Sequence, residues 1–365
     1  MNQPRKSALS AFLILAALGC ADQSGSDPRY VLESCQRVAL IDPSTGQSIV
    51  GVEDGAYHNE RNRLYLSAYD RRAVERSVRR GATALPSGGL YAIPLTELFA
   101  SGAKSLTPRR LLPNNSHPSE IRPHGIDFNE STNEITFLNR VYDQKKGTWT
   151  RSVKIERINI ARLDAPRVSE EARCSANDVL AVGDDILASF DHAVCDWRAG
   201  LEDIFRLKSS GVSIGGGEAV YDQAAFANGL AKIDNDAIAV AATRENSVLF
   251  LSRNENELEE THRVRVPGGP DNLTRSEDGA IVAAVHPSML RLAMNRRLGR
   301  GRAPSRIVQI EPESSSVSVL FDDPEGTLFS AATFAVETPM GLIAGSVTDE
   351  GVLACPAAAD TGRDQ

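Results

Sequence analysis

The stretch Asn177-Asp178-Val179-Leu180-Ala181-Val182-Gly183 places an amide and a carboxylate directly before a short apolar run. Four other short stretches with acidic or amide side chains precede turn and strand patterns: Glu53-Asp54, His124-Gly125-Ile126-Asp127, Phe226-Ala227-Asn228-Gly229 and Asp271-Asn272. Positions 126, 177, 228 and 272 are separated by 51, 51 and 44 residues. A period of about fifty, with one supersecondary unit in each, is typical of a propeller or a solenoid.

Turn residues followed by short apolar or β-branched runs occur in six units along the chain. The turns lie at 59–62, 129–133, 183–185, 234–236, 276–279 and 339–341. We therefore predict an all-β fold, a six-bladed β-propeller, with one helix expected between Trp197 and Lys208. Equivalent positions of every blade converge on the central channel of a propeller. The oxygen-bearing side chains would then meet at one point, where a hard cation could bind.

The first residues resemble a secretory signal. Arg5 and Lys6 precede the apolar run Leu9 to Leu18, which is shorter than the roughly 20 residues that span a bilayer. Cys20 follows Ala17-Leu18-Gly19 as in a bacterial lipoprotein, so we predict its lipidation; cleavage nearby, releasing a periplasmic or secreted protein, is the alternative. The predicted division is a signal peptide at 1–19, a polar tether at 20–33, a single propeller at 34–356 and a disordered tail at 357–365. The protein is thus expected to be exported and anchored to a membrane, with the outer membrane favoured.

Without Cys20, four cysteines remain, an even number that suits an oxidising compartment. They allow three disulfide connectivities. Cys35 and Cys355 lie at the two ends of the predicted domain, and a propeller brings its ends together in one closing blade. A bond there closes a loop of about 320 residues, worth roughly 5 kcal/mol in the chain-entropy model. Cys174 and Cys195 flank one strand-turn-strand unit and could pair across it, whereas no cysteine or histidine spacing supports a zinc site.

The composition fits one globular domain without affinity for nucleic acid. Hydrophobic residues make up 41% of the chain, which is ample for a core. The formal net charge of −8 argues against nucleic-acid binding, which depends on a basic surface. Two basic stretches, Arg71 to Arg80 and Arg291 to Arg306, are interpreted as solvated surface loops. A place at the mouth of the channel is the alternative for both.

Several of these motifs, taken in order, resemble the paraoxonase/arylesterase family. The resemblance covers nearly the whole predicted domain. It rests on Gly51-Val52-Glu53-Asp54, Pro123-His124-Gly125-Ile126, the stretch from Asn177 to Gly183, Phe226-Ala227-Asn228-Gly229, Asp271-Asn272, His286-Pro287 and the terminal cysteines Cys35 and Cys355. It implies a six-bladed propeller with two calcium ions in its channel, which hydrolyses lactones and aryl esters. The expected substrate is therefore a small ester or lactone.

The resemblance also assigns ligands to the two calcium ions. The catalytic ion would be held by Glu53, Asn177, Asn228, Asp271 and Asn272. The structural ion would be held by Asp54, Asp178 and the backbone carbonyl of Ile126. Calcium takes six to eight oxygen ligands, and carboxylates mixed with amides suit it. Burying such acids without a cation would be costly.

Calcium would polarise the substrate carbonyl and stabilise the oxyanion that follows. The resemblance indicates His124 as the base that activates water, with Asp271 as an alternative or a partner. The position of the family's second histidine is occupied by Arg140, which cannot accept a proton. His192, His286, Phe226 and Tyr69 are weaker candidates for the substrate pocket.

Two alternatives to this calcium-dependent esterase or lactonase stay open. A calcium-stabilised propeller that binds a ligand or a partner protein without turnover is favoured by Arg140. A sugar-lactone hydrolase with one divalent ion is the other, although the pair Asp54 and Asp178 indicates two ions.

Overall fold

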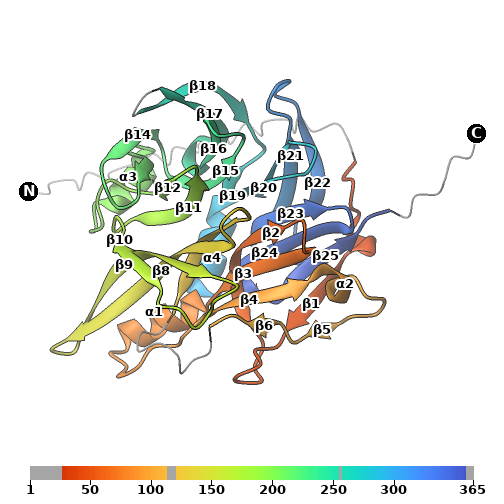
Figure 1. Ribbon diagram of the computed structural model, residues 1–365, viewed down its shortest axis with the longest axis horizontal. Coiled ribbons are helices and arrows are strands. Elements are labelled where there is room, and N and C mark those ends of the chain that lie inside the picture. The colour runs from red at the N-terminus through yellow and green to blue at the C-terminus, as the bar shows by residue number, and fades with distance from the viewer. Residues whose placement is uncertain (1–26, 113–120, 255–256, 359–365) are drawn as a thin grey trace, which may run out of the picture.

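The computed structural model describes residues 27–112, 121–254 and 257–358. The predicted signal peptide, Cys20, half of the predicted tether and most of the predicted tail lie outside these residues. The described chain is mainly β-strand, gathered in several separate sheets (Figure 1). No helix within the described ranges has the length and apolar composition needed to cross a bilayer.

Four sheets each contain four consecutive antiparallel strands. The first contains β7 (Pro123–Asn129), β8 (Glu134–Lys145), β9 (Thr148–Asn159) and β10 (Val168–Glu171). The second contains β11 (Ala176–Val182), β12 (Asp185–Phe190), β13 (Ser210–Ile214) and β14 (Ala219–Ala224). The third contains β15 (Ala227–Lys232), β16 (Ala237–Ala242), β17 (Ser247–Asn254) and β18 (Glu257–Arg265). The fourth contains β19 (Gly269–Arg275), β20 (Ile281–His286), β21 (Ser305–Ile310) and β22 (Val317–Asp323).

A nine-stranded sheet joins the two ends of the described chain, so that the red and blue ends of the ribbon lie side by side (Figure 1). Its strands are β1 (Gln36–Leu40), β2 (Val50–His58), β3 (Arg63–Ala68), β4 (Gly89–Pro94), β5 (Ser105–Leu106), β6 (Arg109–Arg110), β23 (Ala332–Thr338), β24 (Gly341–Glu350) and β25 (Val352–Pro356). The first strand, β1, pairs with the last, β25, and β24 pairs with β2, β23 and β25. The end of the chain therefore completes a sheet that its beginning opened.

The six predicted turn and strand units are confirmed. Each turn leads into a second strand, namely β3, β8, β12, β16, β20 or β24. The strands before these turns are β2, β7, β11, β15, β19 and β23. Each of these six strands packs against the next, and β23 packs against β2. These contacts form a cycle that returns to β2, and we call the six strands the innermost strands.

The core lies between neighbouring sheets and consists largely of small and branched side chains. Strand β16, for example, reads Ala-Ile-Ala-Val-Ala-Ala and is buried on both faces. Val240 contacts one neighbouring sheet within a cluster that includes Leu180, while Ala239 belongs to the cluster on the other side. Strands with such composition fit closely between two others because their side chains are short.

Both predicted cysteine pairs are confirmed as disulfides. Cys35 and Cys355 join the segments before β1 and within β25, and Cys174 and Cys195 are bonded across 21 residues. The first bond lies beside the β1–β25 pairing, where Gln36 is opposite Ala354. It therefore ties the two ends of the chain together.

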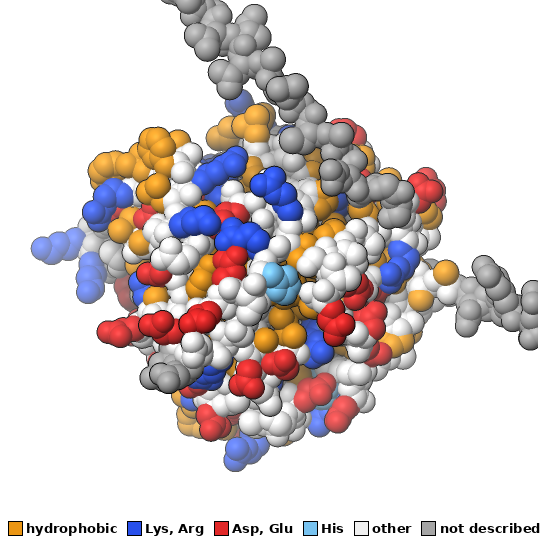
Figure 2. Space-filling model, turned by 90° about the horizontal axis from the view of Figure 1, so that it is seen from above, with side chains coloured by type: hydrophobic (Ala, Val, Ile, Leu, Met, Phe, Trp, Pro, Cys, Tyr) orange, Lys and Arg blue, Asp and Glu red, His pale blue; other side chains and the backbone are white. Residues whose placement is uncertain are grey.

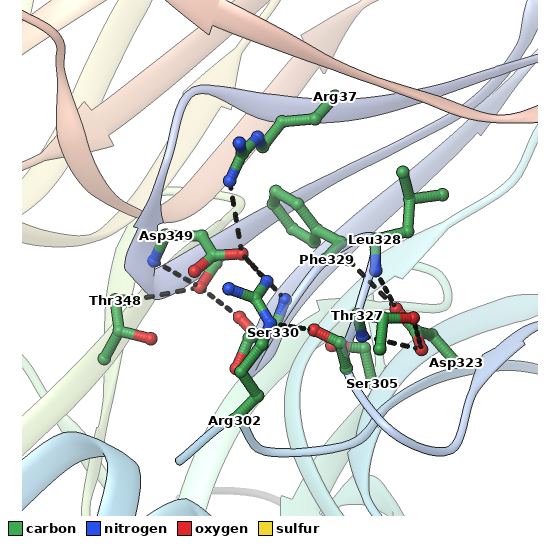
Figure 3. A network of polar contacts seen from close by, with 12 residues as sticks. Arg37, Arg302, Ser305, Asp323, Thr327, Leu328, Phe329, Ser330, Thr348 and Asp349 are labelled. Atoms are coloured by element: carbon green, nitrogen blue, oxygen red, sulfur yellow. Dashed lines mark hydrogen bonds and ion pairs between the residues drawn. The ribbon is translucent and has the colours of Figure 1, made fainter. Parts of the chain in front are cut away.

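Carboxylates organise the connection between β22 and β23 (Figure 3). Asp323 accepts backbone N–H bonds from Thr327, Leu328 and Phe329. Asp349 of β24 accepts one from Ser330 and pairs with Arg302 at 2.6 Å. Buried backbone donors need such acceptors, so these side chains hold an irregular segment against the nine-stranded sheet.

The first basic stretch is a helix almost throughout, and the second is helical up to Leu298, so their interpretation as loops was wrong for these parts. Helix α1 (Arg71–Arg79) begins where the side chain of Asp70 accepts the N–H of Ala73. Helix α4 (Met289–Leu298) begins where Ser288 accepts the N–H of Arg291. An N-cap residue satisfies one of the free N–H groups at a helix start. The chain also forms α2 (Leu95–Leu98) and, within the stretch predicted to be helical, α3 (Ala199–Phe205).

The two disulfides close loops of very different length, which predicts different losses of stability. Replacing both Cys35 and Cys355 by serine should lower the free energy of unfolding more than replacing both Cys174 and Cys195. In the chain-entropy model, the difference between 320 and 21 residues corresponds to about 2 kcal/mol. Urea unfolding of the two double variants and the parent, all oxidised, would measure it. Equal losses would contradict the prediction.

Candidate active site

Every innermost strand is interrupted by a register shift at one place. The shifts lie between Val52 and Asp54, Pro123 and Ile126, Ala176 and Val179, Ala227 and Leu230, Pro270 and Leu273, and Ala332 and Phe334. The residues inside or bordering these shifts include nearly all the predicted calcium ligands. Bulges redirect side chains and are frequent beside active sites. The irregularity thus redirects the polar side chains that the innermost strands carry.

The predicted residues divide between two cavities at opposite sides of these bulges. A cavity of about 280 Å³ is lined by Glu53, Asn177, Asn228 and Asp271. A wider one of about 630 Å³ is lined by Asp54, Ile126 and Asp178. Adjacent residues such as Glu53 and Asp54 therefore face different cavities. Apart from Asn272, which lines neither cavity, this division follows the two predicted ligand sets. We call the smaller cavity the upper pocket.

His124 lies behind the upper pocket, not in its lining. Its Nδ1 atom is 2.7 Å from Oε2 of Glu53, and its Nε2 atom is 2.5 Å from Oδ1 of Asn177. Burial, followed by the charge of Arg140, lowers the pKa of His124 to about 4. Nε2 forms a hydrogen bond with Asn177, whereas buried Nδ1 is close to Glu53 but has no partner of hydrogen-bond geometry. The imidazole therefore contacts the side chains of both Glu53 and Asn177.

Asp271 does line the upper pocket, and its two carboxylate oxygens have different partners. Asn228 donates an N–H to Oδ1 at 2.5 Å, while Nε2 of His286 lies 2.7 Å from Oδ2. His286, also predicted for the pocket, is 3% exposed. The Asp271 carboxylate is therefore oriented by an amide and an imidazole.

The backbone carbonyl of Glu53 accepts two hydrogen bonds from side chains of other innermost strands. Asn272 donates its amide N–H to this oxygen at 3.0 Å, and Thr333 of β23 donates its hydroxyl at 2.7 Å. Thr333 also lines the upper pocket, although the sequence analysis missed it. It occupies the bulge of the sixth innermost strand. The repeating period would have indicated the strand, but no acidic or amide side chain marks the position.

Asp54 and Asp178 are the two carboxylates predicted to bind the structural calcium ion, and we call their surroundings the deeper site. Asp54 accepts the N–H of Ile126 at 2.9 Å, and Asp178 accepts that of Leu230 at 2.7 Å. Burial and then the neighbouring Asp178 carboxylate raise the pKa of Asp54 well above its usual value, and burial likewise raises that of Asp178. No arginine, lysine or histidine of the described chain forms an ion pair with either acid. Two buried carboxylates without a cation fit a bound calcium ion.

Gly125 allows this close approach. A Cβ atom at this position would lie 2.4 Å from Oδ1 of Asp178, which is far inside contact distance. Gly229 is similar, since its Cβ would be 2.4 Å from Cα of Asn272. The two glycines of the predicted motifs therefore let neighbouring innermost strands meet.

The upper set fits calcium by chemistry but less well by charge. Its members offer carboxylate and amide oxygens, which calcium prefers. However, Arg71 donates to Oε1 of Glu53 at 3.1 Å, and its charge together with that of His124 lowers the pKa of Glu53 against the effect of burial. Among the described residues, no group of three or more His, Cys, Asp or Glu side chains is arranged to hold a metal. The amides would have to complete any site.

Of the predicted wall residues, Phe226 and His192 line the upper pocket, but Tyr69 does not. The rings of Phe226 and His192 meet edge to face, with centroids 5.2 Å apart. Phe226 has a φ of 64° at the start of β15, an unusual backbone conformation that occurs at functional sites. Tyr69 is instead buried in a cluster with Val74 and Leu85.

The remaining lining comes largely from segments that the sequence analysis placed on the surface. Arg71 of α1 and Arg296 of α4 face the upper pocket, as does Arg151 of β9. The disulfide-bonded Cys195 contributes to the wall near α3. The only signal in the sequence was the density of arginine in the two basic stretches.

The sequence of this chain matches one protein family over most of its length. The sequence matches the arylesterase family over residues 88–355, so the chain belongs to that family. Membership supports hydrolysis of esters or lactones in general. No curated protein sequence matches the chain.

Several solved structures are similar in fold, at low identity. A putative gluconolactonase shares 14% identity, covers 88% of this chain and 91% of its own, and has a TM-score of 0.49. A gluconolactonase from Xanthomonas campestris shares 13% identity over 85% of this chain and 86% of its own, with a TM-score of 0.48. The periplasmic gluconolactonase of Pseudomonas aeruginosa shares 10% identity over 84% and 89%, with a TM-score of 0.46.

His192 provides a test of the pocket's electrostatics. Its Nδ1 lies 2.6 Å from Oδ1 of Asp191 and its Nε2 lies 3.5 Å from Oδ1 of Asp203. Burial opposes protonation, but the hydrogen bonds with both aspartates outweigh it and raise the pKa of His192 to about 10. A raised pKa adds stability that is fully present below the unfolded value near 6.5 and is lost as the pH rises through 10.

His192→Gln should therefore lower the free energy of unfolding at pH 6 by about 1 kcal/mol, and by less at pH 10. Urea unfolding at the two pH values would measure both differences. The matched control is His262→Gln, which removes an exposed imidazole of β18 on the outer surface. A loss for His192→Gln that grows with pH would contradict the interpretation.

Proposed function

We propose that this protein is a calcium-dependent hydrolase of carboxylic esters or lactones, built on a six-bladed propeller. The observation that carries the proposal is the coincidence of bulges and oxygen-bearing side chains on the innermost strands, in a member of the arylesterase family. The finer assignments rest on the contacts of individual residues.

Six blades follow if the nine-stranded sheet is divided in two. Strands β2, β3, β4 and β6 would form the first blade, and β23, β24, β25 and β1 the last. The short pairing of β2 with β24 would join the two at their inner ends. On this interpretation the Cys35–Cys355 bond closes the last blade, whose strands come from both ends of the chain.

Two sets of residues would hold calcium. Asp54, Asp178 and the backbone of Ile126 would bind the deeper ion, and Glu53, Asn177, Asn228, Asp271 and Asn272 would bind the upper one. The deeper set is supported by two buried carboxylates that lack a cationic partner. The upper ion would supply Lewis-acid polarisation of the substrate carbonyl.

Asp271 is the better placed of the two proposed bases. It faces the upper pocket, while His286 and Asn228 hold its two oxygens in a defined orientation. His124 is absent from the pocket lining and contacts the side chains of Glu53 and Asn177, so it would position these two residues. A water molecule in the pocket would lose its proton to Asp271 while its oxygen attacks the carbonyl carbon. The C–O bond to the leaving oxygen would then break, and that oxygen would take up the proton from Asp271 to form the alcohol.

A binding propeller without turnover is the second candidate. It is favoured by Glu53, whose two carboxylate oxygens already contact Arg71 and His124. It is also favoured by Arg140 at the position of the family's second histidine. In this case the deeper calcium would stabilise the fold, and the upper pocket would bind a ligand.

Export remains part of the proposal. The expected lipidation of Cys20 and anchoring to the outer membrane depend on residues outside the described ranges. Disulfides are typical of oxidising compartments, and the two in the described chain agree with export.

The first experiment is hydrolysis of a panel of small lactones and phenyl acetate, with calcium, after chelation and after calcium is restored. We expect activity that chelation removes and calcium restores. Asp271→Asn should lower kcat by at least about a hundredfold, since general base catalysis contributes that much or more. His124→Gln should have a smaller effect, because its contacts are to other side chains. Absence of turnover on every substrate would favour the binding propeller.

The deeper calcium site has a test that does not depend on activity. Adding calcium to the chelated protein should raise Tm, and Asp178→Asn should reduce this rise because one of the two paired carboxylates is lost. Differential scanning calorimetry with and without calcium would measure it.

Asp323→Asn is the matched control, since Asp323 is also buried and accepts backbone N–H bonds. It should lower Tm equally in both conditions. A rise with calcium that is the same in the parent and in Asp178→Asn would refute a deep site at Asp178.

A further inference from the structure

Arginine side chains gather at one side of the upper pocket. Arg71, Arg151 and Arg296 line it, and they come from α1, β9 and α4. Arg140 of β8 does not line the pocket, but it lies on the same face of the β8–β9 pair as Arg151, because Arg140 is opposite Val153 and Tyr142 is opposite Arg151. Segments separated by up to 225 residues thus bring four guanidinium groups to one place.

Arg140 has no carboxylate partner among the described residues. The residue is only 3% exposed, and its buried Nε atom donates no hydrogen bond. Its backbone N–H bonds to the carbonyl oxygen of Arg122, but no ion pair of the guanidinium occurs within the described part of the chain. A buried charge without a partner is costly, and such a charge is kept where a ligand will pair with it.

The other three arginines share few carboxylates. Arg71 pairs with Glu53 at 3.1 Å and with Glu75 at 3.7 Å, and Arg296 pairs with the same Glu75 at 3.5 Å. Arg151 donates a hydrogen bond to the carbonyl oxygen of Cys174. Within the described structure, the ion pairs of the four arginines therefore involve only Glu53 and Glu75 from this side of the pocket.

Mutual repulsion is visible in the acid–base properties of the cluster. The charge of Arg140 is the largest cause that lowers the pKa of Arg151. The charge of Arg71, followed by burial, lowers the pKa of Arg296 to about 10. Each group is disfavoured by the next, so an anion placed among them would relieve the repulsion.

Several exposed arginines of the described chain each have carboxylate partners of their own. On the outer surface, basic and acidic side chains lie beside one another (Figure 2). Arg263, for example, pairs with Glu260 at 2.6 Å and with Glu245 at 2.7 Å. Arg253 pairs with Asp185 at 2.5 Å. Two arginines of the pocket wall, Arg71 and Arg296, differ from these in being less exposed and in sharing the carboxylate of Glu75.

We propose that this wall recognises an anionic group, a carboxylate or a phosphate, on the ester or lactone that the pocket accepts. The inference rests on the proposed hydrolase for the reaction, but the anion site itself does not require turnover. Arginine binds such groups through paired N–H donors in a planar fork. The uncharged part of the substrate would then lie towards Asp271, Asn228 and Phe226, which also line the pocket.

Binding of unreactive probes tests the site directly. Isothermal titration calorimetry, with calcium held equal in cell and syringe, would compare glutarate and propyl phosphate with neutral glutaramide. We expect the parent to bind at least one anion about tenfold or more tightly than glutaramide. The stronger of the two anions identifies the group. Equal binding of all three, or no binding of either anion, would overturn the inference.

Two variants test the arginines. Arg296→Met removes a guanidinium group that lines the pocket, and Arg140→Met removes the guanidinium group that has no carboxylate partner in the described structure. Each should weaken the anion by about tenfold and leave glutaramide unchanged, as expected for loss of a charge-assisted contact. Arg140→Met should keep or raise Tm, because an uncompensated buried charge is removed. Arg253→Met is the matched control outside the pocket. An equal loss in Arg253→Met would show a general effect of net charge and would overturn the site.

Kinetics separates this inference from the proposed function. The substrates are a γ-butyrolactone that carries a carboxylate at its γ carbon and the corresponding carboxamide. The parent should hydrolyse the carboxylate with the higher kcat/KM, and Arg296→Met should remove the preference mainly through KM. Binding of the anions without hydrolysis of either lactone would disprove the hydrolase and keep the anion site. Equal hydrolysis of the two lactones, without binding of either anion, would support the hydrolase and disprove the anion site.

Discussion

The innermost strands are held to one another by side chains, and the rest of the structure depends on these contacts. These strands belong to different sheets, and polar side chains bridge most of the interfaces between them. Three aspartates accept backbone N–H groups of the next strand: Asp54 from Ile126, Asp127 from Ala181 and Asp178 from Leu230. Two threonines donate their hydroxyls to backbone carbonyls, Thr274 to Ala335 and Thr333 to Glu53. Asn228 donates its amide N–H to the side chain of Asp271. A buried backbone donor or acceptor must be satisfied. The bulges leave such groups free, and the side chains of the next strand satisfy them.

This arrangement explains why the polar residues are both structural and functional. Asp54 and Asp178 satisfy backbone donors of the neighbouring strands, yet burial makes their charge costly. The same carboxylates are therefore the natural ligands of a cation in the proposed channel. Folding and metal binding would be coupled because one set of oxygens serves both.

The upper pocket has two chemically different sides. Its floor presents Glu53, Asn177, Asn228 and Asp271, and one wall presents arginines from α1, β9 and α4. Acidic and amide oxygens suit a cation, whereas guanidinium groups suit an anion. Two polar residues near the end of β24 fix the position of α4. Thr348 donates its hydroxyl to Asn295 of α4 at 2.8 Å, and Asp349 pairs with Arg302, which follows α4 in the chain. These contacts hold α4, and with it Arg296, against the nine-stranded sheet.

The sequence by itself determined the repeating strands, the pairing of the terminal cysteines and the polar residues that the innermost strands carry; the structure established the second disulfide, Cys174–Cys195. Turn residues and short apolar runs are local signals, and the ends of a repeating fold must meet, which brings Cys35 to Cys355. Only the tertiary structure decided which side chains face which cavity. A bulge changes the direction in which a side chain points, and the sequence does not show where a bulge lies. The order of the residues therefore could not predict that Glu53 and Asp54 face different cavities, or that His124 lies outside the lining of the upper pocket. Nor could the positions of Arg71, Arg140 and Arg296 be read from the chain, because the meaning of a charge depends on the partners that folding brings to it.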